Sequence, residues 1–94
     1  MTEVTVTLTG RLEAASAIPW ILHRGRLLSL RGWVRRIDDA TIEMALQGPE
    51  PLLDAMEVAC SLGPGDVMVE TVTRAAYHGA TFRNGFEHLD AARA

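Results

Sequence analysis

Residues 30–47 read Leu-Arg-Gly-Trp-Val-Arg-Arg-Ile-Asp-Asp-Ala-Thr-Ile-Glu-Met-Ala-Leu-Gln and contain the most informative pattern in the chain. Apolar side chains alternate with mostly polar ones over residues 41–47, which is typical of a half-buried β-strand. Residues 30–37 are predicted to form another strand, and the Asp38-Asp39-Ala40 break between the two is short enough for a hairpin turn. The side chains of the later strand predicted to face the core are Ile42, Met44 and Leu46.

A further strand is predicted before this hairpin and another after it. Residues 4–9, Val-Thr-Val-Thr-Leu-Thr, alternate strictly and place their apolar side chains on one side of the chain. Gly10 ends this strand. The last strand is predicted from Val67 to about Tyr77, followed by a loop at residues 78–84 and a short segment at residues 85–89. The inward side chains of the first strand are Val4, Val6 and Leu8.

Two helices are predicted between the strands. Ser16 is placed to cap the first helix, and Pro19 falls in its first turn, where a missing N–H does little harm. The second helix begins near Pro49-Glu50-Pro51 and ends before Gly63-Pro64-Gly65. Residues at helical spacing form one apolar stripe on each helix. These stripes are Ala17, Ile21, Gly25 and Leu28 on the first helix and Leu53, Met56 and Cys60 on the second.

The predicted order of elements is β-α-β-β-α-β, the split βαβ arrangement. It predicts an α+β, ferredoxin-like sandwich in which two helices cover one face of a four-stranded antiparallel sheet. Of the 94 residues, 48% are hydrophobic and 22% charged, which is ordinary for a globular domain and excludes a disordered tail. We therefore expect residues 1–94 to form one domain.

The N-terminus and the cysteine usage suggest where the chain works. Met1-Thr2-Glu3 lacks the basic and apolar regions of a signal peptide, and the longest apolar run, residues 17–22, is far shorter than the ~18 residues needed to span a bilayer. With one cysteine the chain has no internal disulfide. We expect a cytoplasmic protein that does not enter membranes.

The charge is unevenly distributed along the chain. Five of the nine arginines lie in residues 16–37, a segment without acids that carries +5, whereas the rest of the chain carries −8. Such a segment can steer an anionic partner, although a solvated arginine-rich face is the ordinary interpretation. Trp33 lies between Arg31 and Arg35, which favours a cation–π stack. The net charge of −3 and the lack of further stacking aromatics argue against a nucleic-acid partner.

Four consecutive residues, Gly32-Trp33-Val34-Arg35, resemble the Gly-Trp-Val-Arg signature of the acylphosphatase family. Gly10 lies where the family has the glycine that ends its first strand, at the same distance from Gly32. The resemblance continues through Gly48-Pro49 and Gly63-Pro64 to Asn84-Gly85-Phe86, so it covers nearly the whole chain. It implies the βαββαβ fold of these small enzymes and, as their activity, the hydrolysis of acyl phosphates.

The chain departs from the family where the chemistry should be. In the family, a Gly-x-Val-Gln-Gly-Val-x-Phe-Arg loop holds the phosphoryl group with backbone N–H groups and its terminal arginine. The resemblance places Ile18 at that arginine, Glu13 at the glutamine and Ala14 at the second glycine. Arg36 stands where the family has the asparagine that orients the attacking water. The resemblance therefore implies that both catalytic residues are missing, and no residue here is predicted to be catalytic.

Three residues are candidates for an anion-binding site: Arg11, Ser16 and Arg36. The side chain of Arg36 should point to the same side of its strand as Val34, and a guanidinium there could bind phosphate bidentately. A protonated arginine has no lone pair with which to activate water. In the alternative interpretation, Arg36 turns outward and contacts only solvent or the adjacent Asp38 and Asp39.

The remaining residues predict neither a metal site nor a cofactor, because the histidines His23, His78 and His88 are widely spaced. Three function classes stay open. The first is an acylphosphatase-like domain that has lost hydrolysis and serves as a small binding or interaction module, with phosphate or an acyl phosphate as its ligand. The second is a weak acylphosphatase whose anion site is rearranged around Arg36. The third is a small subunit that pairs with a protein partner or a second copy through an edge strand.

Overall fold

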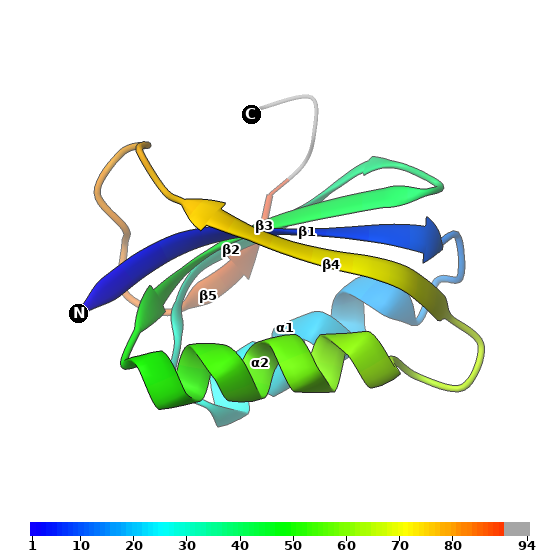
Figure 1. The fold of residues 1–94 in the computed structure, drawn as a ribbon, viewed down its shortest axis with the longest axis horizontal. Coiled ribbons are helices and arrows are strands. Elements are labelled where there is room, and N and C mark those ends of the chain that lie inside the picture. The colour runs from blue at the N-terminus through cyan, green and yellow to red at the C-terminus, as the bar shows by residue number, and fades with distance from the viewer. Residues whose placement is uncertain (90–94) are drawn as a thin grey trace.

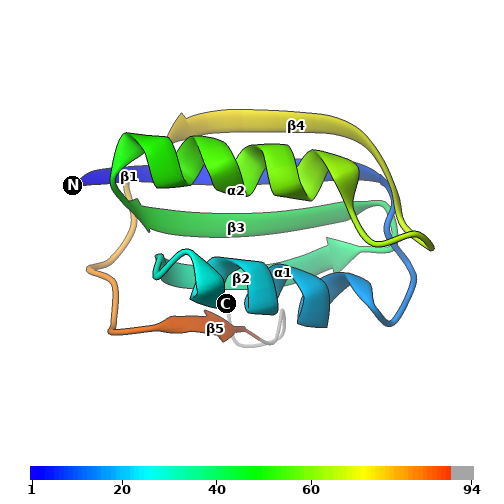
Figure 2. The same ribbon diagram turned by 90° about the horizontal axis from the view of Figure 1, so that it is seen from below.

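The computed structural model describes residues 1–89, which contain two helices and five strands. Their bounds are β1 Thr2–Arg11, α1 Ala17–Leu27, β2 Arg31–Asp38, β3 Thr41–Gly48, α2 Glu50–Leu62, β4 Met68–Ala76 and β5 Phe86–His88. The strands form one sheet in the order β4-β1-β3-β2-β5, and both helices cover the same face of it (Figure 1, Figure 2). The α+β, ferredoxin-like architecture predicted from the sequence is confirmed.

The sheet differs from the prediction in having a fifth strand. β5 pairs in parallel with β2, with Phe86 opposite Gly32 and His88 opposite Val34. The predicted four-stranded, wholly antiparallel sheet is therefore wrong, and the sheet is mixed. A strand of three residues is too short to show an alternating pattern, so its pairing could not be recognised from periodicity. The buried side chain of Phe86 holds this strand in place.

The core lies between the sheet and the helices and contains the side chains that alternation and helical spacing predicted. Leu28 is the exception, because α1 ends at Leu27 and Leu28 only packs against the edge of the core. Within residues 1–89, neither helix is long and apolar enough to cross a membrane. The predicted residues that are buried are Val4, Val6, Leu8, Ala17, Ile21, Gly25, Ile42, Met44, Leu46, Leu53, Met56 and Cys60.

Ser16 occupies the N-cap position of α1, but its side chain does not cap the helix. Its Oγ donates a hydrogen bond to Oδ1 of Asp66 at 2.6 Å instead. A capping residue normally has an extended backbone, whereas Ser16 is already helical with ψ −16°. The predicted cap is therefore wrong, and the hydroxyl links the start of α1 to the loop before β4.

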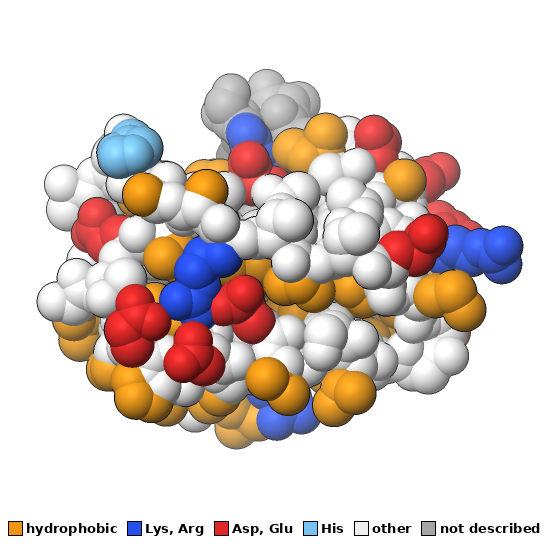
Figure 3. Space-filling view, in the orientation of Figure 1, with side chains coloured by type: hydrophobic (Ala, Val, Ile, Leu, Met, Phe, Trp, Pro, Cys, Tyr) orange, Lys and Arg blue, Asp and Glu red, His pale blue; other side chains and the backbone are white. Residues whose placement is uncertain are grey.

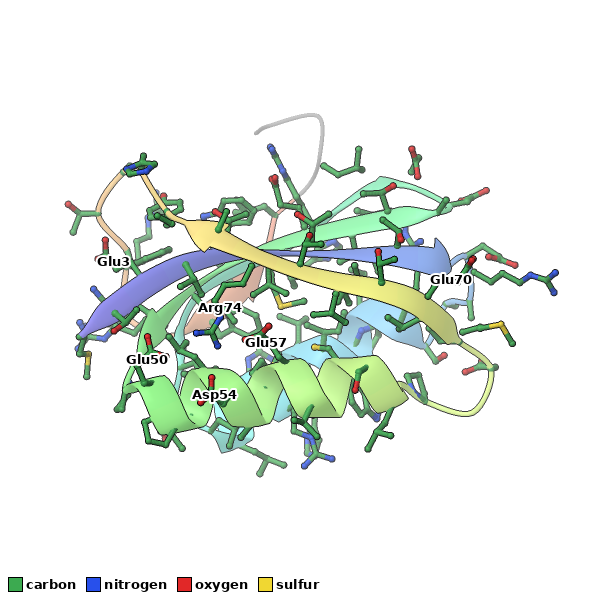
Figure 4. All side chains as sticks on the ribbon, viewed as in Figure 1. Glu3, Glu50, Asp54, Glu57, Glu70 and Arg74 are labelled. Carbon is green, nitrogen blue, oxygen red and sulfur yellow. The ribbon has the colours of Figure 1, made fainter. Side chains whose placement is uncertain are left out.

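Arg74 of β4 joins the sheet to α2 through three carboxylates. Val6 is its partner in the register of β1, so the Arg74 side chain lies on the helix-covered face of the sheet. There it contacts Glu50 at 3.0 Å, Asp54 at 2.9 Å and also Glu57. Figure 4 labels Arg74 and shows the three acids pointing from α2 toward it, and Figure 3, in the same orientation, shows a basic group surrounded by acids on this face. The cluster fixes α2 against the edge strand of the sheet.

Replacing Arg74 by methionine is expected to destabilise the protein by about 1 kcal/mol at low salt. Arg74→Met keeps an unbranched chain in place of the arginine's alkyl part but leaves three carboxylates facing one another without a cation. The loss should shrink in about 1 M sodium chloride, because salt screens the repulsion between partly exposed charges. Urea unfolding at both salt concentrations measures the effect, with Arg83→Met as the control at an exposed arginine. A loss that does not depend on salt would contradict this electrostatic explanation.

Candidate functional site

A hollow of about 590 Å³ opens beside the loop between β1 and α1. Its volume falls within the range of ~300–1,000 Å³ that is typical of small-molecule sites. The loop, α1, β2 and β5 all contribute side chains to it. The lining residues are Glu13, Ala15, Ile18, Pro19, Leu22, His23, Arg26, Arg36 and His88.

Arg36 reaches the hollow from β2 and is fixed by a contact with the loop. Its Nη1 donates a hydrogen bond to the carbonyl oxygen of Leu12 at 2.6 Å. The interpretation in which Arg36 contacts only solvent, Asp38 or Asp39 is therefore wrong. Because a guanidinium has five N–H groups, this bond leaves further donors on a side chain that lines the hollow.

The loop before α1 is held by backbone bonds at both of its ends. The N–H of Leu12 donates to the carbonyl of Asp39 at 3.1 Å, and the N–H of Ala17 donates to that of Ala14 at 3.2 Å. No residue from 11 to 18 has a positive φ. An amide nest that cradles an anion alternates right-handed and left-handed residues, so this loop does not form one.

Ile18 lies where the resemblance placed the family's arginine, and it belongs to the core. Its side chain is 7% exposed and packs in the main hydrophobic cluster. It has no charge and no donor to offer an anion. Ile18 also lines the hollow, so an arginine here would have to turn its charged end out of the core and into the hollow, because burying an unpaired charge is very unfavourable.

The charges around the hollow favour an anion. Arg26 and Arg36 oppose a single carboxylate, that of Glu13, so the formal charge of the lining is +1 with both histidines neutral. The Nε of Arg26 donates to the carbonyl of Phe86 at 3.1 Å, which orients the guanidinium between α1 and β5.

The structure separates the three residues that the sequence suggested for anion binding. Arg36 lines the hollow, whereas Arg11 is exposed at the end of β1 and Ser16 is bonded to Asp66. Sequence reasoning missed His23, Arg26 and His88. His23 and Arg26 share one side of α1 with Pro19 at helical spacing, so a closer look at that pattern could have found them. No such signal existed for His88, because its position depends on the unpredicted strand β5.

The arginines of residues 16–37 do not form one basic patch. Arg24 lies over the ring of Trp20 at 5.4 Å, away from the hollow. Arg35 lies over the ring of Trp33 at 5.2 Å and pairs with Glu43 at 2.7 Å, so the predicted cation–π stack is confirmed for Arg35. Only Arg26 and Arg36 line the hollow. The folded chain distributes the basic segment over separate surfaces.

Cys60 is not a nucleophile in this fold. Its side chain is 1% exposed in the stripe of α2 that faces the core. Burial, together with the negative charge of Glu57, raises the pKa of the thiol to about 12. The reactive thiolate is therefore absent at neutral pH.

Comparisons with known proteins place this chain in one family. The family model for acylphosphatase matches residues 4–88. An acylphosphatase of Rhodopseudomonas palustris is 34% identical over 67 residues, covering 71% of this chain and 68% of that protein. One of Rhodospirillum rubrum is 33% identical over 70 residues, covering 74% and 77%.

Solved structures show the same fold at lower identity. The crystal structure of acylphosphatase from Bacillus subtilis superposes with a TM-score of 0.86 at 20% identity, covering 95% of this chain and 99% of that one. An acylphosphatase from Coxiella burnetii gives 0.84 at 18% identity, covering 94% and 92%. The match of the family model over most of the length confirms the resemblance seen at Gly32-Trp33-Val34-Arg35: the chain belongs to the acylphosphatase family.

Proposed function

We propose that this chain binds a small phosphate-type anion in the hollow around Arg36 and does not hydrolyse acyl phosphates at the rate of an active family member. It then acts as a binding module built on an enzyme fold. The proposal rests on two positions of the hollow, Ile18 and Arg36, whose side chains differ in hydrogen-bonding capacity from those that the family resemblance implies. Ile18 offers no donor, and Arg36 offers donors where the resemblance implies an acceptor for water.

The physical argument against hydrolysis rests on what the transition state needs. A phosphoryl group in transfer spreads negative charge over its oxygens, and losing an arginine that stabilises it lowers the rate by about 10³–10⁵. Losing a single neutral donor aimed at developing charge lowers the rate by about 10²–10³. The carboxylate of Glu13 also lines the hollow, and it repels a phosphate dianion. These losses act together on the same step.

The argument for anion binding rests on the two arginines that remain. Arg36 and Arg26 are each oriented by one backbone carbonyl, which restricts their motion before any ligand arrives. A guanidinium can donate two parallel hydrogen bonds to a phosphate, and an oriented one loses less entropy on binding. Because the hollow is open to solvent, we expect weak affinity that falls as salt increases.

Arg36→Ala is expected to abolish phosphate binding at this site. Titrating the wild-type protein with inorganic phosphate should shift the NMR amide signals of residues 13–18, and the alanine variant should lose these shifts. Arg31→Ala is the matched control, because it removes the same charge from the same strand at a residue outside the hollow. Sodium chloride should weaken the wild-type shifts by screening.

An assay with benzoyl phosphate tests the loss of hydrolysis. We expect the wild-type protein to release phosphate no faster than buffer, with the Bacillus subtilis acylphosphatase assayed alongside as the active reference. A rate within about a hundredfold of that enzyme would contradict the loss of activity and favour a weak acylphosphatase that uses Arg36. Amide shifts that survive in Arg36→Ala would place the anion elsewhere.

A further inference from the structure

The acidic residues of α2 all lie on one side of the helix, and this leaves its outer side without charge. Glu50, Asp54 and Glu57 follow one another at i, i+4 and i+7, and all three contact Arg74 (Figure 4). The outer side carries Val58, which is 61% exposed, and Leu62, which is 77% exposed. Such a pair of exposed apolar side chains one turn apart is available for contact with another molecule.

This outer side of α2 forms one wall of a groove whose other wall is α1. The two helices lie side by side and run in opposite directions (Figure 2). Hydrophobic side chains gather along the lower edge of the view in Figure 3, beneath α2. The groove has a volume of about 620 Å³, and it shares no lining residue with the hollow around Arg36. Its lining residues are Trp20, Arg24, Ala55, Val58, Ala59, Leu62 and Gly63.

Arg24 is the one charged residue of this lining. Its guanidinium carbon lies 5.4 Å from the centre of the Trp20 ring. Within residues 1–89 its side chain makes no hydrogen bond or ion pair, and its Nε is buried without a partner. A buried N–H without an acceptor is unfavourable, and the cation is already held in place by the ring. The groove therefore offers one oriented, uncompensated positive charge in an apolar setting.

We propose that this groove binds an amphipathic helix of a partner protein. The partner helix presents leucine-like side chains at helical spacing to the apolar wall and a glutamate or aspartate to Arg24. Two neighbouring helices form a groove into which the side-chain ridge of a third helix packs, and apolar anchors then contact Val58 and Leu62. The carboxylate satisfies the charge that the chain itself leaves unpaired.

Charge complementarity favours such a helix over a second copy of this chain. In a twofold dimer the same surface meets itself, so a second copy would bring a second Arg24 to the groove and no lining carboxylate. The free edge of β4 is also a poor dimer surface. The register of β4 shifts beside Gly10, and Arg74 points inward, and both features hinder pairing with another strand.

Two synthetic peptides of about 18 residues test the proposal. Both carry the same leucine face, and the residues beside that face are glutamates in one peptide and lysines in the other. We expect the glutamate peptide to shift the NMR amide signals of residues 20–24 and 55–62, and to bind at least about tenfold more tightly than the lysine peptide. Leu62→Glu should lower its affinity at least about tenfold, and Arg24→Gln should remove its advantage over the lysine peptide.

Ile37→Glu serves as the control, because it places the same new charge at a half-exposed apolar residue outside the groove. Circular dichroism shows whether each variant is folded. Equal binding of the two peptides, no binding of either at about millimolar concentration, or binding that survives Leu62→Glu would overturn the proposal. So would a dimer in sedimentation experiments that Leu62→Glu dissociates, since a second copy would then cover the groove. None of these outcomes affects phosphate binding at Arg36.

Discussion

A variant that matches the family at five positions, four in the loop motif and one on β2, is expected to hydrolyse benzoyl phosphate about a hundredfold faster than one that restores only the two catalytic side chains. The five substitutions are Glu13→Gln, Ala14→Gly, Ala15→Val, Ile18→Arg and Arg36→Asn. The two-substitution variant carries only Ile18→Arg and Arg36→Asn. Residues that act as one unit are strongly non-additive, so the side chains and the loop should each be ineffective without the other.

Both variants lose the contacts of Arg36 and Ile18, so the unchanged loop is the reason why the two-substitution variant should fail. Arg36→Asn removes the hydrogen bond to the carbonyl of Leu12, which anchors the start of the loop. Ile18→Arg places a charge where a 7% exposed side chain now packs in the core. The loop has no left-handed residue, and a left-handed conformation at Ala14 would be unfavourable by ~1–2 kcal/mol. An arginine at the start of α1, beside a loop of the wrong shape, is misplaced relative to the loop amides, and about 1 Å of misplacement can lower the rate ~10²-fold.

The measurement is kcat/KM for benzoyl phosphate in the wild type, the two-substitution variant and the five-substitution variant. Circular dichroism and urea unfolding establish that each one is folded. A third variant with only the three loop substitutions is the control that separates the loop from the catalytic side chains. If the two-substitution variant were as active as the five-substitution variant, the present loop would already hold the phosphoryl group, and the interpretation of residues 13–15 would be wrong.

Gly32→Ala is expected to lower the free energy of unfolding by ~4 kcal/mol or more, which would leave little folded protein. Gly32 has φ +142°, and a Cβ atom there would lie 1.8 Å from the carbonyl oxygen of Ala45 in β3. That oxygen belongs to the backbone of the adjacent central strand, so the clash can be relieved only by moving the sheet. Gly10 is in the same situation, with φ +148° and a Cβ position 2.1 Å from the carbonyl oxygen of Met68.

Two other glycines serve as graded controls. Gly85 also has a positive φ of +87°, but nothing lies within 4 Å of its Cβ position. Gly85→Ala should therefore lose only the ~1–2 kcal/mol of a left-handed conformation. Gly65 has neither a positive φ nor a neighbour within 4 Å, so Gly65→Ala should be neutral or slightly stabilising. Urea unfolding of these variants ranks their losses in free energy of unfolding. Equal losses for Gly32→Ala and Gly85→Ala would show that the close contact with Ala45 is unimportant.

Much of the fold could be predicted from the sequence, because strands and helices leave patterns among residues that are close together in the chain. The alternation in residues 4–9 and 41–47 assigned the core side chains of β1 and β3, and helical spacing assigned those of α2. These patterns reflect the directions of side chains two or four residues apart, which the local backbone sets. Strand β5 could not be predicted from such patterns, because its three residues are stabilised by a parallel strand more than fifty positions away in the chain.

The candidate site, like the fold, could be predicted only in part from the sequence. The residue types and the family resemblance were enough to predict that Ile18 offers no donor and that Arg36 offers one. The hydroxyl of Ser16 illustrates the opposite case. Its position before α1 predicted a helix cap. Instead, the hydroxyl donates its hydrogen bond to Asp66, fifty residues further along the chain. A side chain near a helix start has several acceptors in reach, and the folded neighbours settle the competition.

The pattern of residue types was thus sufficient for the order of β1–β4, α1 and α2 and for most of their inward faces. The surroundings of three arginines depended on the folded chain: Arg24 lies in the groove, Arg36 contacts the loop and Arg74 lies among three acids. Hydrophobic burial follows a period of two or about four residues that is visible in any short window. A guanidinium, in contrast, finds its partner through space, and the pairing of distant strands and helices determines which carbonyl, ring or carboxylate lies within its reach.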